Sequence, residues 1–187
     1  MQWILVLNLF DLYIGIFKRC QKKWQKMFKV DVVDNFLKKE DYTHLRQMLE
    51  SDNFPWYFYL HTANKTNDIF NYQFIHLFYR DDVPNSDYFD ILKPLIKQIN
   101  PISLIRVKAN LNPISHKLVK FDKHIDQPIK CKVAIYYIND NNGYTVVGKE
   151  KIKSKSNRIV FFNSSLEHYG TNSTNCKNRM LINFNYF

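Results

Sequence analysis

The chain has 187 residues, of which 45% are hydrophobic and 16% aromatic, and its formal net charge is +10 at pH 7. This length and composition exclude an intrinsically disordered chain and predict one domain with a hydrophobic core. The charge alone fits either a nucleic-acid partner or a solvated basic surface, and the second is the more common cause.

The first part of the chain differs from the rest. Residues 1–17 are mostly apolar and residues 18–26 are basic. The apolar run is shorter than a membrane-spanning helix, contains Asp11, and precedes its positive charges, whereas a signal peptide has the opposite order. We interpret residues 1–27 as an extension, either an appended helix or a start assigned too early; a membrane anchor is the weaker alternative. The predicted domain covers residues 28–187, and we expect no membrane association.

Two helices are predicted in the first half of this domain. Residues 28–37 indicate a short strand followed by a turn, and residues 40–53 and 86–100 have helical periodicity. The apolar faces of the two helices consist of Leu45, Met48 and Leu49, and of Phe89, Leu92, Ile96 and Ile99. Pro94 falls inside the second helix, where proline bends or ends helical structure.

The remaining segments are rich in aromatic and β-branched residues, which favour strands. The expected strands are residues 54–64, 70–82, 103–111, 132–139, 144–147, 150–155, 158–163 and 180–187. Asn142-Gly143 predicts a hairpin turn, and Gly148-Lys149 and Ser156-Asn157 are weaker turn signals. Helices followed by many antiparallel strands indicate an α+β fold whose second half is a sandwich or barrel.

Two histidines and one carboxylate are candidate metal ligands. His124 and Asp126 are two positions apart, so in an extended segment both side chains point to the same side. His168 follows the apolar run at residues 159–162. Together these three could occupy one face of an octahedral metal such as Fe(II) and leave three positions open. An H-x-D pattern alone is equally consistent with ordinary core or surface polar residues.

The last predicted strand has one polar face. By the period of two, this face contains Arg179, Leu181, Asn183 and Asn185. Burying an arginine and two asparagines is costly unless an anionic group lies against them, and a guanidinium matches a carboxylate of a dicarboxylic acid. The alternative is an edge strand with one solvated face.

Several motifs occur in order between residues 104 and 187: R-x-K-A-N-L, H-x-D-x-P, A-I-Y-Y-I-N, N-N-G-Y-T, N-R-I-V-F-F-N-S-S, H-x-G and R-x-L-I-N-F-N-Y-F. Together they resemble the Fe(II)/2-oxoglutarate-dependent oxygenase superfamily, most closely its prolyl 4-hydroxylase branch and small members encoded by marine bacteriophages. Segments upstream extend this resemblance over nearly all of residues 28–187. Residues 1–27 have no counterpart.

The resemblance implies a double-stranded β-helix, which is a jelly-roll or cupin-like barrel, with N-terminal supporting helices. It implies that Fe(II) is bound by His124, Asp126 and His168. It also implies that Arg179 anchors the distal carboxylate of 2-oxoglutarate. Three further residues are implied to contact this co-substrate, namely Tyr137, Asn110 and Asn183. Tyr137 is equally well interpreted as a core tyrosine of a barrel strand.

Two departures from the family pattern concern residues around the metal centre rather than the ligands. Many relatives have a co-substrate tyrosine near the position that Asn112 occupies here. The segment Y-T-V-V-G-K also lacks an acidic residue that some relatives have. The first departure implies that one co-substrate contact is lost or replaced. The second implies a different edge of the site where the substrate would bind.

The implied activity is that of a dioxygenase that consumes O2, is stimulated by ascorbate, and hydroxylates an unactivated C–H bond; no catalytic residue is expected beyond the metal centre. The expected partner is a peptide or protein substrate, with proline as the first choice of residue. The alternatives are a nucleobase- or nucleotide-modifying oxygenase of the same superfamily and a non-catalytic barrel. The three unpaired cysteines indicate a reducing compartment. We therefore expect the cytoplasm, or the host cytoplasm if the chain is phage-encoded.

Overall fold

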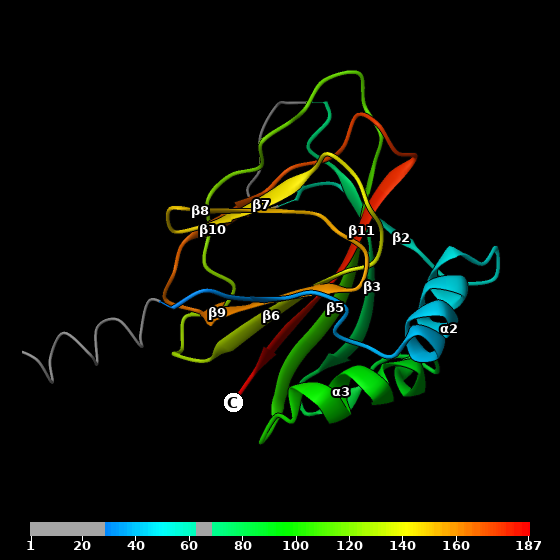
Figure 1. Ribbon diagram of the computed structural model, residues 1–187, viewed down its shortest axis with the longest axis vertical. Coiled ribbons are helices and arrows are strands. Elements are labelled where there is room, and N and C mark those ends of the chain that lie inside the picture. Colours follow the sequence, from blue (N-terminus) through cyan, green and yellow to red (C-terminus); the bar gives the residue numbers. More distant parts are fainter. Residues whose placement is uncertain (1–28, 63–68) are drawn as a thin grey trace, which may run out of the picture.

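The computed structural model describes residues 29–62 and 69–187 (Figure 1). The predicted extension at residues 1–27 lies outside the described residues. Within the described ranges, no helix combines the length and the apolar character needed to cross a bilayer.

The described chain forms two antiparallel sheets. The larger sheet contains β1 (Asp31–Val33), β2 (Tyr57–Tyr59), β3 (Gln73–Arg80), β4 (Val83–Pro84), β5 (Leu104–Pro113), β6 (Lys132–Tyr137), β9 (Arg158–Asn163) and β11 (Asn178–Tyr186). Its strand order is β1-β9-β6-β11-β5-β3-β2, with β4 paired to β3. The smaller sheet has the order β10-β7-β8 and contains β7 (Tyr144–Val147), β8 (Glu150–Lys153) and β10 (His168–Gly170).

The two sheets face each other across an interior that both of them line (Figure 1). Strands of the larger sheet contribute Ile135, Val160 and Leu181 to a buried hydrophobic cluster, and the smaller sheet contributes Val147 and Ile152. Burial of apolar side chains between two facing sheets holds such a sandwich together. The architecture is the jelly-roll barrel of an α+β protein, as expected.

Helices cover the outer face of the larger sheet. These are α2 (Lys39–Glu50), the 3-10 helix η1 (Phe89–Leu92) and α3 (Lys93–Ile99). Leu45 and Leu49 of α2 and Leu95 of α3 share a second buried cluster with outward-facing residues of the sheet. The helix predicted at residues 86–100 is divided because Pro94 lies in the first turn of α3, the position where its missing N–H costs least.

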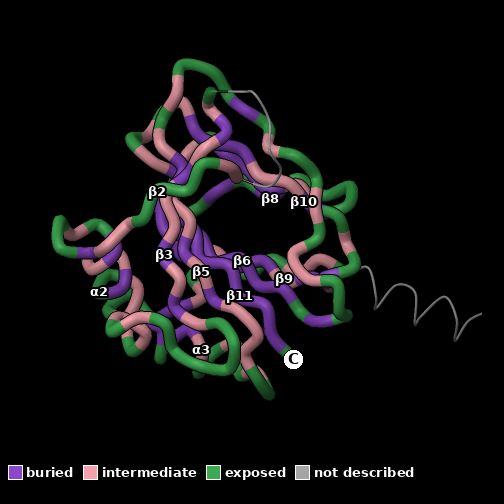
Figure 2. Tube along the Cα trace, turned by 180° about the vertical axis from the view of Figure 1, so that it is seen from behind, coloured by how far each residue is buried: buried purple, intermediate pink, exposed green. Residues whose placement is uncertain are grey.

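Successive side chains of β11 point alternately into the two hydrophobic cores. Met180, Ile182 and Phe184 face the helices, whereas Leu181 faces the interior of the barrel. This strand pairs with both β5 and β6, so it lies in the middle of the larger sheet. Figure 2 shows the central strands buried and β2 exposed at the edge of the sheet. The polar face predicted for this strand is therefore an inner face, which excludes a solvated edge strand.

The turn predictions are partly wrong. Gly148-Lys149 connects β7 and β8 as a two-residue hairpin, and Gly148 has a φ of 57°. Asn142-Gly143 is not a hairpin turn, because β6 and β7 belong to different sheets. Ser156-Asn157 does form a turn, closed by the hydrogen bond from the backbone N–H of Arg158 to the carbonyl of Lys155 at 3.2 Å. This turn joins β8 in the smaller sheet to β9 in the larger one, so it is not a hairpin. Both segments are crossings between the sheets.

Candidate metal centre

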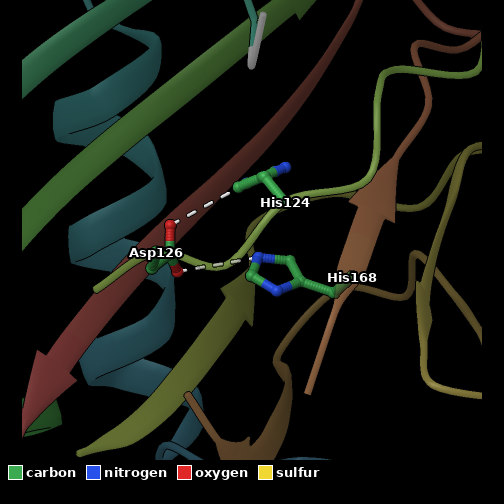
Figure 3. A group of neighbouring side chains, drawn as sticks. All are labelled: His124, Asp126 and His168. Atoms are coloured by element: carbon green, nitrogen blue, oxygen red, sulfur yellow. Dashed lines mark ion pairs between the residues drawn. The ribbon is translucent and has the colours of Figure 1, made fainter. Parts of the chain in front are cut away.

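Three predicted ligands come together at one end of the barrel interior. His124 and His168 face each other across an isolated antiparallel bridge, in which each backbone N–H donates to the other residue's carbonyl at 3.0 Å. Asp126 lies next to both imidazoles (Figure 3). One potential ligand atom from each of the three residues lies within 4.8 Å of the others. The arrangement therefore has the size of a site for one ion.

Both histidines direct the same ring nitrogen, Nε2, towards the position between the three residues. Nδ1 of His124 lies 3.0 Å from the carbonyl oxygen of Asp122, and Nδ1 of His168 lies 3.4 Å from that of Leu166. A carbonyl can only accept, so Nδ1 carries the proton in both rings. Each Nε2 then has a free lone pair directed at Asp126, at 3.9 Å for His124 and 3.6 Å for His168. Such outer hydrogen bonds are typical of metal-binding histidines.

The carboxylate of Asp126 is held by three neighbouring side chains. Nη2 of Arg106 donates to one oxygen at 2.9 Å, and Nδ2 of Asn183 donates to the other at 2.8 Å. Nδ2 of Asn185 also approaches that second oxygen at 3.3 Å. Burial opposes the negative charge, but the attraction to a protonated His168, the charge of Arg106 and the bond from Asn183 outweigh it and lower the pKa of Asp126 to about 2 in the absence of a metal. Asp126 is therefore ionised at neutral pH.

Burial has the opposite consequence for His168, because it lowers the pKa of the imidazole. A neutral imidazole and an ionised carboxylate are the forms that bind metals. Two nitrogen donors and one carboxylate on one side of an ion fit a divalent transition metal with open positions opposite, as in non-haem Fe(II) sites. The protein thus presents a suitable ligand set.

Arg179 lies in the same cavity as the three ligands. It is 1% exposed, and its Nε and Nη2 donate to the hydroxyls of Ser154 at 2.8 Å and Thr145 at 2.9 Å. No carboxylate of the described chain pairs with it, although a buried cation without a counter-ion is costly. Nη1 makes no hydrogen bond to a described residue and stays available for an anion. Arg179 is therefore a candidate anchor for an acidic ligand.

Other buried polar atoms around the cavity also lack partners. Within the described residues these include Oδ1 of Asn110 and Nδ2 of Asn112, both from cavity-lining residues. The hydroxyl of Tyr137 lies beside Thr145 without a well-aligned hydrogen bond, and Arg179 lies 5.6 Å from the centre of the Tyr137 ring. Buried polar groups are normally paired, so unpaired ones around one cavity indicate a polar ligand. A small dicarboxylate fits these donors.

The crossing at Asn142-Gly143 supports Arg179 directly. A Cβ at Gly143 would lie 2.5 Å from Cδ of Arg179 and 2.6 Å from the backbone oxygen of Asn172. Glycine is required here for close approach rather than for a positive φ. The segment predicted to form a turn thus forms the wall against the arginine.

The structure brings the predicted metal ligands, Arg179, Asn110 and Asn183 together around one cavity. Tyr137 lies in the same interior next to Arg179. Asn183 contacts the ligand Asp126, whereas its predicted role was at the co-substrate. Sequence reasoning did not single out four further residues, which are Arg106, Lys108, Thr145 and Ser154. Arg106 and Lys108 share an alternate-position pattern with Asn110 and Asn112, which puts all four on one face of β5 without indicating that this face points inward.

Comparisons with known proteins add to this geometry. No family model matches the chain, and no curated protein matches it. A prolyl hydroxylase from Trichoplax adhaerens, solved in complex with a hypoxia inducible factor oxygen degradation domain peptide fragment, is similar in structure. Its TM-score is 0.64 at 13% identity, covering 88% of this chain and 86% of that chain.

Two further solved structures are similar over most of their length. A prolyl-4-hydroxylase from Pseudomonas putida has a TM-score of 0.62 at 10% identity, covering 87% of this chain and 94% of that one. HygX from Streptomyces hygroscopicus, solved with nickel and 2-oxoglutarate bound, has a TM-score of 0.54 at 12% identity, covering 90% and 86%. At such low identity, the likeness establishes that the chain shares the fold of these proteins.

Proposed function

We propose that this protein is an Fe(II)- and 2-oxoglutarate-dependent dioxygenase that hydroxylates an unactivated C–H bond, with a peptidyl residue such as proline as substrate. The observation that carries the proposal is the pairing, within one cavity, of a two-histidine, one-carboxylate site with a buried arginine that has no counter-ion among residues 29–62 and 69–187. The fold shared with prolyl hydroxylases supports it.

In this proposal His124, Asp126 and His168 hold Fe(II), and Arg179 binds the distal carboxylate of 2-oxoglutarate. The bound iron and co-substrate supply the oxidising chemistry: O2 and 2-oxoglutarate are consumed, C–H becomes C–OH, and succinate and carbon dioxide are released. In this proposal Tyr137 and Asn112 add hydrogen bonds to the same co-substrate, which is supported by their buried polar atoms having no partner in the described part of the chain.

In this proposal the protein itself positions the metal ligands and the co-substrate and excludes water from the cavity. Arg106 and Asn183 fix the orientation of the Asp126 carboxylate, so the ligand does not have to reorganise when metal binds. Arg179 and the unpaired amides orient the co-substrate along the cavity. The hydrophobic cluster between the sheets keeps water from the inner end.

The first test is succinate formation with Fe(II), 2-oxoglutarate and ascorbate, measured without an added substrate. We expect slow uncoupled turnover by the wild type and loss of turnover in His168→Ala, because one of three ligands is missing. His44→Ala, at an exposed position of α2, is the matched control and should retain activity. Mn(II) binding by calorimetry gives a readout independent of turnover. Unchanged Mn(II) affinity in His168→Ala would refute the metal site.

The second test concerns the substrate. Proline-containing peptides and oligonucleotides would be incubated separately with the enzyme, and mass spectrometry would detect the gain of one oxygen atom. We expect the gain on peptides, since the structurally similar Trichoplax protein was solved with a peptide. If only oligonucleotides gained oxygen, the peptide substrate would be refuted in favour of a nucleobase, and the proposed oxygenase chemistry would still hold.

A further inference from the structure

Lys108 is a cation that the proposed function does not use. It lies on β5, lines the cavity together with Asp126, His168 and Arg179, and is only partly accessible. Among the described residues, no carboxylate forms an ion pair with it. A lysine in such a position is uncommon unless an anion approaches it.

The other charges of the cavity do not require Lys108. Arg106 is paired with Asp126. Fe(II) and the oxoglutarate dianion would cancel each other, with Arg179 at the distal carboxylate. A fully loaded centre would therefore keep two excess positive charges, one on Arg179 beside the distal carboxylate and one on Lys108. The charge on Lys108 remains for the substrate to neutralise.

Lys108 and Arg179 lie at different levels of the cavity. In the antiparallel pairing of β11 with β5, Asn183 is opposite Lys108, whereas Arg179 is opposite Asn112. Four residues along a strand correspond to roughly 13 Å between backbone positions. Lys108 is at the level of Asn183, which contacts the metal ligand Asp126, so it is at the metal end. The two cations therefore serve separate anionic groups.

The environment of Lys108 makes an anionic partner favourable. Burial, followed by the positive charges of Arg106 and Arg80, lowers the pKa of the ammonium to about 8, and the charge of Asp126 offsets this only in part. An added anion would relieve this unfavourable state. The lowered pKa supports the argument that charge at this position is poorly compensated by the protein alone.

We propose that Lys108 forms a substrate subsite for a carboxylate next to the carbon that is oxidised. A single ammonium matches a monoanion such as a carboxylate. The charge of the neighbouring Arg106 guanidinium is already balanced by Asp126, so the remaining positive charge at this position matches one negative charge rather than a phosphate dianion. The carboxylate belongs either to an acidic side chain beside the target residue or to the carboxyl terminus of a short peptide or free amino acid. This inference rests on the proposed function.

The test uses substrate pairs that differ only in charge. Proline-containing peptides would carry Glu or Gln beside the proline, and a second pair would end in a free carboxylate or an amide. Binding would be measured without O2, on protein loaded with Mn(II) and 2-oxoglutarate, and turnover would be measured as succinate formed above the uncoupled rate. The first pair detects a side-chain carboxylate and the second a terminal one; preference for the acid in either pair supports the proposal.

We expect wild-type protein to bind the acidic member at least about 30-fold more tightly, the lower end of what losing one partner of a buried charge pair costs. In Lys108→Met the ratio of acid to amide affinity should fall towards one, and Lys108→Arg should keep part of it. Lys97→Met, on the exposed face of α3, is the matched lysine control and should keep the full ratio. Thermal melting would verify that each variant is folded.

Three outcomes would overturn the proposal. The first is equal affinity of wild-type protein for acid and amide. The second is a Lys108→Met variant that keeps the ratio but requires more 2-oxoglutarate in the uncoupled reaction, since Lys108 would then belong to the co-substrate site. The third is preference for nucleotides over every carboxylate. Absence of uncoupled turnover together with an intact acid preference would instead refute the proposed function and leave the anion subsite standing.

Discussion

At the scale of single residues, the most consequential contact outside the ligand set is that of Arg106 with Asp126. Arg106→Gln removes the charge that, with the Asn183 amide, fixes the carboxylate. We expect metal affinity to fall by about 10- to 100-fold, the usual effect of losing an outer-shell partner. Mn(II) calorimetry measures this directly. Arg46→Gln, on α2, is the control, and equal affinities of the two variants would contradict a positioning role for Arg106.

The pH dependence of substrate binding is a second prediction at this scale. The charged groups acting on Lys108 are Arg106, Arg80 and Asp126, and together with burial they place its pKa at about 8. The lowered pKa means that the ammonium is present below about pH 8 and is lost as pH rises through that value. The acid preference of wild-type protein should therefore decline between pH 7 and 9. A constant ratio over this range would show that Lys108 does not contact the carboxylate.

The sequence allowed some of these residues to be found and not others. His124, Asp126 and His168 were candidates because H-x-D places two ligands on one side of an extended segment, and Arg179 because it interrupts an apolar strand. Arg106 and Lys108 also alternate on one face of β5. Charged residues at alternate strand positions usually face solvent, so their inward direction becomes evident only when β5 is placed between β3 and β11.

At the scale of elements, the crossing at Asn142-Gly143 provides a matched pair of glycine variants. Gly143→Ala would bring a Cβ against Arg179 and the Asn172 backbone, so we expect loss of stability together with a higher 2-oxoglutarate requirement. Gly148→Ala, in the hairpin between β7 and β8, has free space but a φ of 57°. It should cost about 1 kcal/mol of stability without affecting 2-oxoglutarate. Melting curves and uncoupled kinetics of both variants test this contrast.

The same elements show why turn signals were misleading. Asn-Gly favours a tight hairpin when the flanking strands are partners, but the chain after β6 leaves the larger sheet and enters the smaller one. Strand locations follow from local composition, whereas partners depend on contacts far apart in sequence. The pairing of β1 with β9, for example, joins Val32 to Val160. Such pairings have no local signature.

At the scale of the whole molecule, the site is built from both sheets. His168 comes from the smaller sheet, while Arg179 belongs to the larger sheet and donates to Thr145 of the smaller one. Mn(II) and 2-oxoglutarate together should therefore stabilise the entire barrel, by about 2.7 kcal/mol for a ligand at 100 times its Kd. Differential scanning calorimetry measures the rise in Tm. In His168→Ala the rise in Tm caused by Mn(II) should be lost. A full rise in Tm in this variant would contradict the assignment of His168 as a metal ligand.

The fold class was predictable because alternation and helical periodicity are local properties, and both persist along long segments of this chain. The outcome is an α+β jelly-roll in which the predicted polar face of β11 points inward. The order of the strands was not predictable from the residues alone. It arises from closing the barrel around one core while the helices bury a second core against the outer face of the larger sheet, which is a property of the assembled chain.

The central place of β11 has a consequence for biosynthesis. Its partners β5 and β6 are made earlier, yet neither contacts the other in the finished sheet except through this strand. A nascent chain that has not reached residue 178 therefore exposes two unsatisfied strand edges and lacks Arg179. Closure of the barrel must wait for translation of residues 178–186, and until then those two edges are open to pairing with other chains.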